Sequence, residues 1–282
     1  MTTAKNHPRN NANFPNEAHP KAGGNSFTDL LSRALTEPGM LSAAYRRFHR
    51  FSLGNQILAA AQLTQRGMPL SPIASFNRWQ ELGRSVRKGE RALALFMPVT
   101  IKKRGQEGEP DDVQRVGETF IQFKLANRWF SIEQTDGAEY AEPMATPIWH
   151  QKQALAQMDI TQEHFSMVDG NVQGYAVERR IAINPIAEYP HKTCFHEIAH
   201  IVLGHTKSRG CWDAVTMPRN LQEVEAEGVA YLLCSILDLP GQCESRGYIQ
   251  SWLADDQLPE KAAQRIFNAA QKIIGAGKLH QE

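Results

Sequence analysis

Cysteine is scarce in this chain: its 282 residues include four, Cys194, Cys211, Cys234 and Cys243. No two of them form a C-x-x-C pair, and no P-C-x-x-C motif is present. These absences exclude a zinc deaminase and argue against disulfide bonds. We therefore expect all four to be reduced, buried thiols of a cytoplasmic protein.

Long apolar runs are also missing. The longest extends from Val229 to Leu237, which is far too short to cross a bilayer. The first 24 residues are rich in Asn, Pro and His and contain no apolar stretch, which predicts a disordered tail and not a signal peptide. We expect a soluble protein without a membrane partner.

The chain also lacks an overall excess of either charge, since its formal net charge is +1. Basic and acidic residues are nevertheless unevenly distributed along it. Residues 25–98 contain ten Lys/Arg and four Asp/Glu, which gives +6. Residues 99–145 contain six against nine, giving −3, and residues 146–282 contain twelve against sixteen, giving −4. The pattern predicts a basic front half and a mildly acidic back half.

The segment KTCFHEIAHIVLGH, residues 192–205, has the spacing of a metal site on a helix. Apolar residues recur at i, i+3, i+4 and i+7 from Phe195, which predicts one buried helical face. His196 and His200 are one turn apart on such a helix, so both imidazoles can bind one ion. Glu197 lies beside them and can accept a proton from a water molecule whose pKa the metal lowers. This is the HExxH motif, although a core helix with two incidental histidines has the same pattern.

A third ligand distinguishes these alternatives. His205 is one position away from the metzincin pattern HExxHxxGxxH, so we expect it to lie at the helix C-terminus, where the helix dipole favours it. Residues 220–241 predict a second helix, on which Glu223 and Glu227 lie one turn apart and Glu225 points elsewhere. One glutamate of the pair can ligate the ion while the other orients a ligand histidine.

The two helices together predict one zinc ion held by His196, His200 and Glu223, with Glu197 as the catalytic base and Glu227 as the supporting carboxylate. A solvated acidic helix face is the alternative, but apolar residues surround the two glutamates. The order resembles the gluzincin arrangement, HExxH followed by ExxxD, with Glu227 in place of Asp. This departure leaves open which of the two glutamates is the ligand.

The periodicity predicts an α+β chain of two domains behind the tail of residues 1–24. Residues 25–140 form a helix-plus-antiparallel-sheet domain, and residues 141–282 form a zincin-like, gluzincin-type metallopeptidase domain. The segment 135–147 gains proline and acidic residues, which predicts the linker. In the second domain we expect a sheet-edge strand, Arg180–Asn184, that can pair with an extended peptide. Helices are expected at 26–37, 43–65, 75–82 and 149–158, strands at 91–101, 119–125, 127–135 and 179–185, and an exposed loop at 102–118.

The stretch 75–99 combines cations with an aromatic ring and glycine turns. Such a combination suits single-stranded nucleic acid, because cations follow the phosphates and the ring stacks on a base. Arg84, Arg87 and Lys88 are the expected phosphate contacts, and Trp79 either stacks on a base or packs beneath the loop. The alternative is a solvated basic turn over a core tryptophan.

Three segments resemble the N-terminal domain of ArdC-type antirestriction proteins, which is also found in some plasmid primases. They are YRRFHRFSLGNQILAAAQ (45–62), FNRWQELGRSVRKGERALALFMPV (76–99) and RWFSIEQTDG (128–137). The HExxH segment and EVEAEGVAYLLC (223–234) resemble the metallopeptidase-like domain of the same family. The resemblance covers about residues 26 to 240.

The resemblance implies a single-stranded DNA-binding domain joined to a zincin domain. Such proteins are carried by mobile elements, act against restriction during DNA entry, and reside in the cytoplasm of a bacterial donor or recipient cell. The DNA contacts that we expect on this basis are Arg46, Arg50, Asn55, Gln56, Trp79, Arg84, Arg87 and Lys88.

Two functions compete. In the first, the basic domain coats single-stranded DNA and the zinc-binding domain is structural or regulatory. In the second, the protein is a DNA-tethered zinc metallopeptidase that cleaves a host protein, and a primase-associated accessory role is a further alternative. The intact Glu197 favours hydrolytic chemistry, because a purely structural zinc site needs no general base. DNA binding is the activity that we favour.

Overall fold

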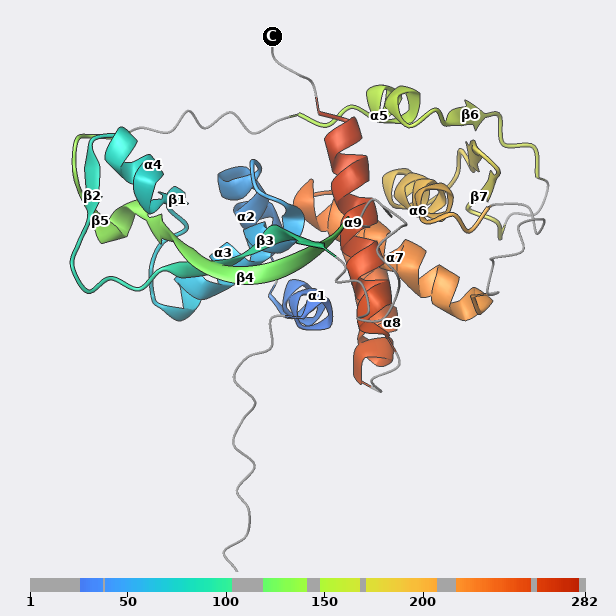
Figure 1. The fold of residues 1–282 in the computed structure, drawn as a ribbon. Helices are drawn as coiled ribbons and strands as arrows, with labels where there is room; N and C mark the ends of the chain where they lie inside the picture. The colour runs from blue at the N-terminus through green and yellow to red at the C-terminus, as the bar shows by residue number, and fades with distance from the viewer. Residues whose placement is uncertain are drawn as a thin grey trace, which may run out of the picture.

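The protein has a mixed α+β architecture (Figure 1). The expected tail, the insert at 103–118, residues 141–147 and Cys211 lie outside the part of the chain that the structure describes. Within the described part, no helix is long and apolar enough to cross a membrane. The structure is a computed structural model, and it describes residues 26–37, 39–102, 119–140, 148–167, 171–206, 217–254 and 258–278.

The described elements follow one another in this order. The helices are α1 (Phe27–Thr36), α2 (Met40–Phe48), α3 (Leu53–Gln65), α4 (Phe76–Glu81), α5 (Gln151–Gln157), α6 (Pro190–Leu203), α7 (Arg219–Ile236), α8 (Gln242–Ala254) and α9 (Glu260–Ala276). The strands are β1 (Ile73–Ser75), β2 (Arg84–Val86), β3 (Leu93–Lys102), β4 (Thr119–Ser131), β5 (Thr135–Gly137), β6 (Thr161–Glu163), β7 (Gly174–Val177) and β8 (Arg180–Ile183).

The helix predicted at 43–65 is two helices, α2 and α3, so that prediction is wrong. The chain turns between them, where the Phe51 amide donates to the Phe48 carbonyl at 2.8 Å and Ser52 adopts an extended backbone. The change of direction lets α3 be buried on nearly all sides, from Leu53 to Ala61. A straight helix would leave part of this apolar surface in water.

Strands β1, β4 and β3 form an antiparallel sheet in that order. β4 is continuous, so the two strands expected at 119–125 and 127–135 are one, which ends in the 3-10 turn Ile132–Gln134. The outer edge of β3 is covered by α3, whose Gln62 side chain accepts from the Ala94 amide and donates to its carbonyl, both at 2.9 Å. Covering an edge in this way blocks pairing with another strand.

A small lobe at the left of Figure 1 contains α4, β1, β2 and β5. Trp79 is 1% exposed in it, and its indole donates to the Phe130 carbonyl at 2.9 Å. β2 pairs with β5, so residues 135–137 of the expected linker belong to the lobe. The close approach of these strands requires glycine at Gly137, whose φ is 139° and where a Cβ atom would lie 2.4 Å from the Gly83 oxygen.

The back half contains a second sheet, ordered β6-β8-β7. β8 pairs in parallel with β6 and antiparallel with β7, so it is the central strand. The expectation that Arg180–Asn184 forms a free sheet edge is therefore wrong. β7 is the strand beside α6 that has no second partner in the described part of the chain.

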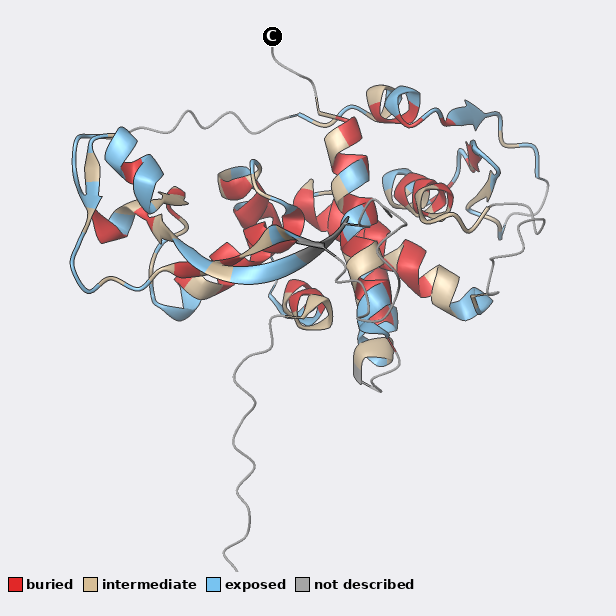
Figure 2. Ribbon diagram, in the orientation of Figure 1, coloured by how far each residue is buried: buried red, intermediate tan, exposed pale blue. Residues whose placement is uncertain are grey.

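One hydrophobic core extends through both halves of the protein (Figure 2). The Glu260 carboxylate of α9 accepts from the Phe27 amide at 2.6 Å, and Gln271 of α9 accepts from the Leu53 amide at 2.6 Å. Tyr231 of α7 donates to the Ala34 carbonyl at 2.9 Å. The back-half helices thus cap and anchor α1 and α3. The division at residue 140 stays a prediction about the chain, and the core is continuous across it.

The buried cysteines Cys194 and Cys234 are 2% and 1% exposed. Cys243, in contrast, is exposed near the start of α8, so the expectation that every cysteine is buried is wrong. The three described cysteines are free thiols.

Candidate metal centre

Helices α6 and α7 pack side by side and bring the predicted ligands together. α6 begins with Pro190 at its first turn and ends at Gly204, which has the left-handed conformation of a helix cap. His196 and His200 project from α6 with their Nε2 atoms 3.1 Å apart. The helical spacing therefore places two imidazole nitrogens at one point, where both can bind one metal ion.

Glu223 of α7 completes a triangle of donors. Its Oε2 atom lies 3.3 Å from Nε2 of His196 and 3.6 Å from Nε2 of His200. Zinc–ligand bonds of about 2.0–2.1 Å in a tetrahedron give ligand–ligand distances of about 3.3–3.4 Å. The three observed distances lie around this value, so the donor set fits one zinc-sized divalent ion. Among the described residues, His196, His200 and Glu223 are the group that can hold one.

Glu227 lies one turn further along α7 and holds His196 from behind. Its Oε2 atom is 3.0 Å from Nδ1 of His196, while its Oε1 atom contacts Lys192 at 2.9 Å and the Ser245 hydroxyl at 2.6 Å. The geometry thus separates the two glutamates that the sequence left open: Glu223 faces the donor triangle and Glu227 faces away from it. Lys192 and Ser245 were not foreseen, because neither belongs to a motif.

Electrostatics at this cluster follow from burial and hydrogen bonding. Burial acts to lower the pKa of His196, but hydrogen bonds with Glu223 and Glu227 outweigh it and raise the pKa to about 9. Burial acts to raise the pKa of Glu227, but contacts with His196, Ser245 and Lys192 lower it to about 2. Hydrogen bonds to both histidines hold the pKa of Glu223 well below its usual range. Without metal, the cluster therefore retains a proton on His196.

Glu197 is buried beside the donor triangle, and burial raises the pKa of its carboxyl group above the usual range. It lines a cavity of about 430 Å³ together with His196, Gly174 and Tyr189. A Cβ atom at Gly174 would lie 2.7 Å from the Thr193 side chain and 3.3 Å from Glu197, so glycine lets β7 approach this wall closely. The carboxylate thus faces a space that can admit a substrate.

His205 and Glu225 also belong to the site, which the sequence did not indicate. His205 does follow the C-terminus of α6, and its Nδ1 atom lies 2.9 Å from Nδ1 of His200. Its Nε2 atom lies 3.0 Å from the carboxylate of Glu225, and Arg265 of α9 contacts the same carboxylate at 2.9 Å. Burial lowers the pKa of the His205 imidazole.

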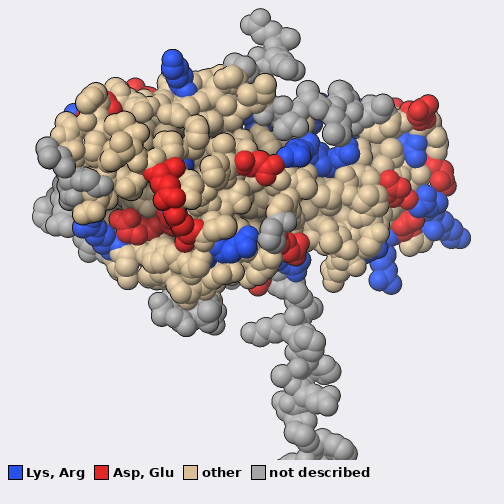
Figure 3. Space-filling model, turned by 180° about the vertical axis from the view of Figure 1, so that it is seen from behind, with Lys and Arg blue, Asp and Glu red and all other residues tan. Residues whose placement is uncertain are grey.

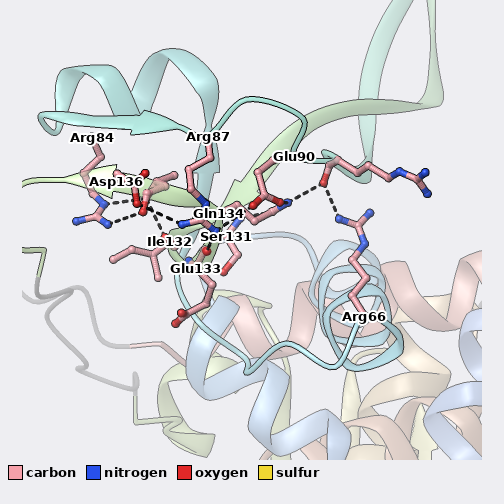
Figure 4. A network of polar contacts seen from close by, with 11 residues as sticks. Arg66, Arg84, Arg87, Glu90, Ser131, Ile132, Glu133, Gln134 and Asp136 are labelled. Atoms are coloured by element: carbon pink, nitrogen blue, oxygen red, sulfur yellow. Dashed lines mark hydrogen bonds and ion pairs between the residues drawn. The ribbon is translucent and has the colours of Figure 1, made fainter.

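The residues expected to contact DNA in the lobe are mostly occupied within the fold (Figure 4). Arg84 donates to the Thr135 hydroxyl at 2.8 Å and to the Thr135 carbonyl at 3.0 Å. Arg87 pairs with Glu90 at 2.9 Å and with Asp136 at 3.3 Å. The burial of Trp79 excludes base stacking and favours the other expected role, packing beneath the loop.

Asn55 and Gln56 are 8% and 2% exposed, so the expectation that they contact DNA does not fit the structure. The Gln56 amide donates to the Phe51 carbonyl at 2.9 Å, and Asn55 bonds to the β3 backbone. Arg46 is exposed but pairs with Asp238. The buried side-chain amides of Asn55 and Gln56 are therefore structural parts of α3.

Arg50 and Lys88 are the expected DNA contacts that remain free: both are exposed, and neither has an ion-pair partner among the described residues. Lys124 and Arg128 are also exposed, on β4. Figure 3 shows basic and acidic side chains intermixed on the lobe, at its right, and acidic side chains gathered toward the left. The face of the lobe seen in Figure 3 is therefore mixed in charge and not uniformly basic.

Comparison with known proteins shows a family domain in the front half of the chain and a shared fold over most of it. Residues 33–129 match the family model of the N-terminal domain of the anti-restriction factor ArdC. The metal-free crystal structure of the antirestriction ArdC protein from plasmid R388 has a TM-score of 0.52 at 20% identity, over 89% of this chain and 94% of that one. The Mn(II)-bound structure of that protein has a TM-score of 0.53 at 19% identity, over 90% and 99%. No curated protein matches the chain.

The matched segment contains all of α2 to α4 and most of the first sheet, together with two of the segments that carried the sequence resemblance, 45–62 and 76–99. The fold similarity extends over nearly the whole of both chains. This chain therefore contains the ArdC N-terminal domain at residues 33–129 and has the fold of the R388 ArdC protein.

Proposed function

We propose that this protein holds one zinc ion at His196, His200 and Glu223 and hydrolyses peptide bonds there, as a zincin-like metallopeptidase. The donor triangle carries the proposal: its three ligand atoms all lie within 4.8 Å of one another. The related ArdC protein of plasmid R388 has been crystallised with Mn(II), which supports a divalent metal in this family.

A zinc ion would supply Lewis-acid chemistry, lowering the pKa of a bound water molecule and polarising a substrate carbonyl. The Glu197 carboxylate is placed to take a proton from water in the cavity and to give it to the departing amine. The raised pKa of Glu197 is closer to neutral pH than that of an exposed glutamate, and this favours a group that both accepts and returns a proton.

The cavity also offers a place for an extended polypeptide. Gly174, the first residue of β7, lines the same cavity as His196 and Glu197. The outer edge of β7 has no strand partner in the described part of the chain, so its backbone groups are open to pairing. A host protein segment bound along β7 would bring its carbonyl toward Glu197, the role first expected of Arg180–Asn184.

Metal content and cleavage test this proposal together. His196→Ala is expected to abolish stoichiometric zinc, whereas Glu197→Gln retains zinc and loses cleavage of a peptide library. One zinc per chain in the His196→Ala protein would contradict the ligand assignment. Cleavage by zinc-loaded Glu197→Gln at the wild-type rate would contradict the assigned base.

Single-stranded DNA binding is the second function that we propose, and it is supported by the family match over residues 33–129. Its candidate phosphate contacts are four exposed cations: Arg50 and Lys88, which have no ion-pair partner among the described residues, and Lys124 and Arg128 on β4. Together these activities would make an antirestriction protein of a mobile element that binds entering DNA and carries a hydrolytic centre.

Salt dependence tests the DNA contacts. Arg50→Ala and Lys88→Ala are each expected to weaken binding to an oligonucleotide and to reduce the salt slope by about 0.7. Lys261→Ala is a matched control, because Lys261 is exposed on α9 in the acidic half. An unchanged affinity and slope for both test variants would contradict this placement.

A further inference from the structure

A chain of buried polar contacts leads from the ligand histidine His200 to helix α9. Nδ1 of His200 lies 2.9 Å from Nδ1 of His205, and Nε2 of His205 lies 3.0 Å from Oε2 of Glu225. Arg265 donates from Nε to Oε1 of Glu225 at 2.9 Å and from a terminal nitrogen to Oε2 at 3.1 Å. The side chains of His205 and Glu225 are 4% and 0% exposed.

One arrangement of protons satisfies every contact when His200 presents its Nε2 lone pair to the donor triangle. Nδ1 of His200 then carries the proton and donates to Nδ1 of His205. His205 is left with its proton on Nε2, which donates to Glu225. The guanidinium of Arg265 donates to the same carboxylate, so the buried charge of Glu225 is both paired and hydrogen-bonded.

The opposite arrangement is unfavourable. If a neutral His205 carried its proton on Nδ1, it would donate toward His200, and the proton of His200 would move to Nε2. The bare Nε2 lone pair of His205 would then face the Glu225 carboxylate at 3.0 Å, with no proton between two acceptors. Arg265 of α9 fixes the Glu225 carboxylate, and this sets the direction of donation along the whole series of hydrogen bonds from Glu225 to His200.

We propose that His205, Glu225 and Arg265 are positioning residues that hold His200 as its Nδ1–H tautomer and keep Nε2 aimed at the metal position. This inference deepens the proposed metal site and rests on it. It gives His200 a support that is independent of the Glu227–Lys192 pair behind His196. The Nδ1 atom of His196 is held directly by Glu227, which pairs with Lys192. The Nδ1 atom of His200 is held through His205 by Glu225, which pairs with Arg265.

A purely structural role would be different in kind. Arg265 also donates to the Leu203 carbonyl at 2.9 Å, so it ties the end of α6 to α9 whether or not metal binds. A role limited to this link would affect melting temperature but not the proton position on His200. Metal affinity and the tautomer of His200 are therefore the decisive measurements.

The test uses the full-length protein and the variants His205→Phe and His205→Gln. Phe keeps the ring but removes both hydrogen bonds, whereas the Gln amide can accept from His200 and donate to Glu225. His205→Phe is expected to weaken zinc binding, measured by chelator competition, by about 10- to 100-fold. His205→Gln is expected to restore most of that loss. His191→Phe is the control, because His191 is an exposed residue of the same helix.

Nitrogen-15 NMR of the histidine rings in the metal-free protein gives a second readout. Wild type is expected to show His200 as one Nδ1–H tautomer, and His205→Phe as a mixture. Glu225→Gln keeps its amide oxygen on Arg265 and turns its NH₂ group to His205, which is expected to shift the proton of His200 to Nε2. Circular dichroism identifies the folded variants.

If folded His205→Phe and folded Glu225→Gln both keep the wild-type tautomer of His200, the proposal is overturned, even if zinc affinity falls. Wild-type zinc affinity in His205→Phe would overturn it as well. If the wild-type protein binds no zinc, the proposed metal centre fails, and the metal-free NMR comparison alone decides the tautomer. A variant that does not fold is replaced by Arg265→Lys, which keeps the charge but not the two-pronged contact.

Discussion

Asn55 on α3 and Phe96 on β3 form a two-way hydrogen-bonded pair. The side-chain amide of Asn55 donates to the Phe96 carbonyl at 3.0 Å and accepts from the Phe96 amide at 2.7 Å. Gln62, two helical turns further on, makes the same pair with Ala94. Side chains of α3 thus hydrogen-bond to the backbone N–H and C=O groups of Ala94 and Phe96 on β3, as a neighbouring strand would.

We expect Asn55→Ala to destabilise the protein by about 2 to 4 kcal/mol, because it leaves both backbone groups of Phe96 without partners. Urea unfolding measures the effect. Gln65→Ala is the matched control, because Gln65 is an exposed amide on the same helix and is expected to change stability little. Equal stability of the two variants would show that covering the β3 edge is unimportant.

Cysteine accessibility gives a second prediction. Burial raises the pKa of the Cys194 and Cys234 thiols to about 12, so almost no thiolate is present at pH 8. In a Cys211→Ser background, we expect one rapid reaction with a thiol reagent, at the exposed Cys243, and two more only after unfolding. Rapid reaction that persists after adding Cys243→Ser would contradict the burial of the other two.

The structure brings the predicted metal ligands together but uses most of the predicted DNA contacts within the fold, and the difference has a physical reason. The ligands lie on two regular helices, where a spacing of three or four residues fixes which side chains share a face. Periodicity could therefore place His196 and His200 on one helix face and Glu223 and Glu227 on another, although it left open which glutamate is the ligand. Arg265 could not, because its contact depends on how α9 crosses α6 and α7.

The lobe shows the opposite case. Arg84 and Trp79 stand in a segment whose composition is typical of nucleic-acid contacts. Arg84 is used within the fold where β2 pairs with β5, however, and Trp79 donates to the Phe130 carbonyl of β4. A basic or aromatic residue has the same sequence signature whether its partner is a phosphate or a carbonyl of its own chain. The break between α2 and α3 was missed similarly, since the helical periodicity continues through it.

Metal binding is expected to release a proton. The pKa of His196 in the metal-free protein is raised to about 9, so His196 is protonated at pH 7.5 and must lose that proton to ligate. Zinc affinity should rise tenfold per pH unit below about 9 and level off above it. Calorimetry in buffers of different ionisation enthalpy counts the released protons.

Glu227→Gln is the matched variant for this measurement, because the hydrogen bond with Glu227 helps to raise the pKa of His196. Fewer protons should be released from this variant at pH 7.5 than from wild type. Zinc binding by the wild-type protein at pH 7.5 without proton release would contradict the protonated metal-free state.

Hydrolysis and DNA binding are expected to be separable at Glu197, although the core is continuous. Glu197 faces a cavity that is also lined by Glu188, Glu227 and Glu244, and phosphates avoid such acidic surface. Glu197→Gln should therefore remove any peptide cleavage and leave affinity for one oligonucleotide at one salt concentration unchanged. Zinc removal, in contrast, is expected to weaken DNA binding modestly, because α9 connects the helices of the metal site to α1 and α3. A tenfold loss of DNA affinity in Glu197→Gln, about 1.4 kcal/mol, at an unchanged melting temperature would show that the metal centre itself handles DNA.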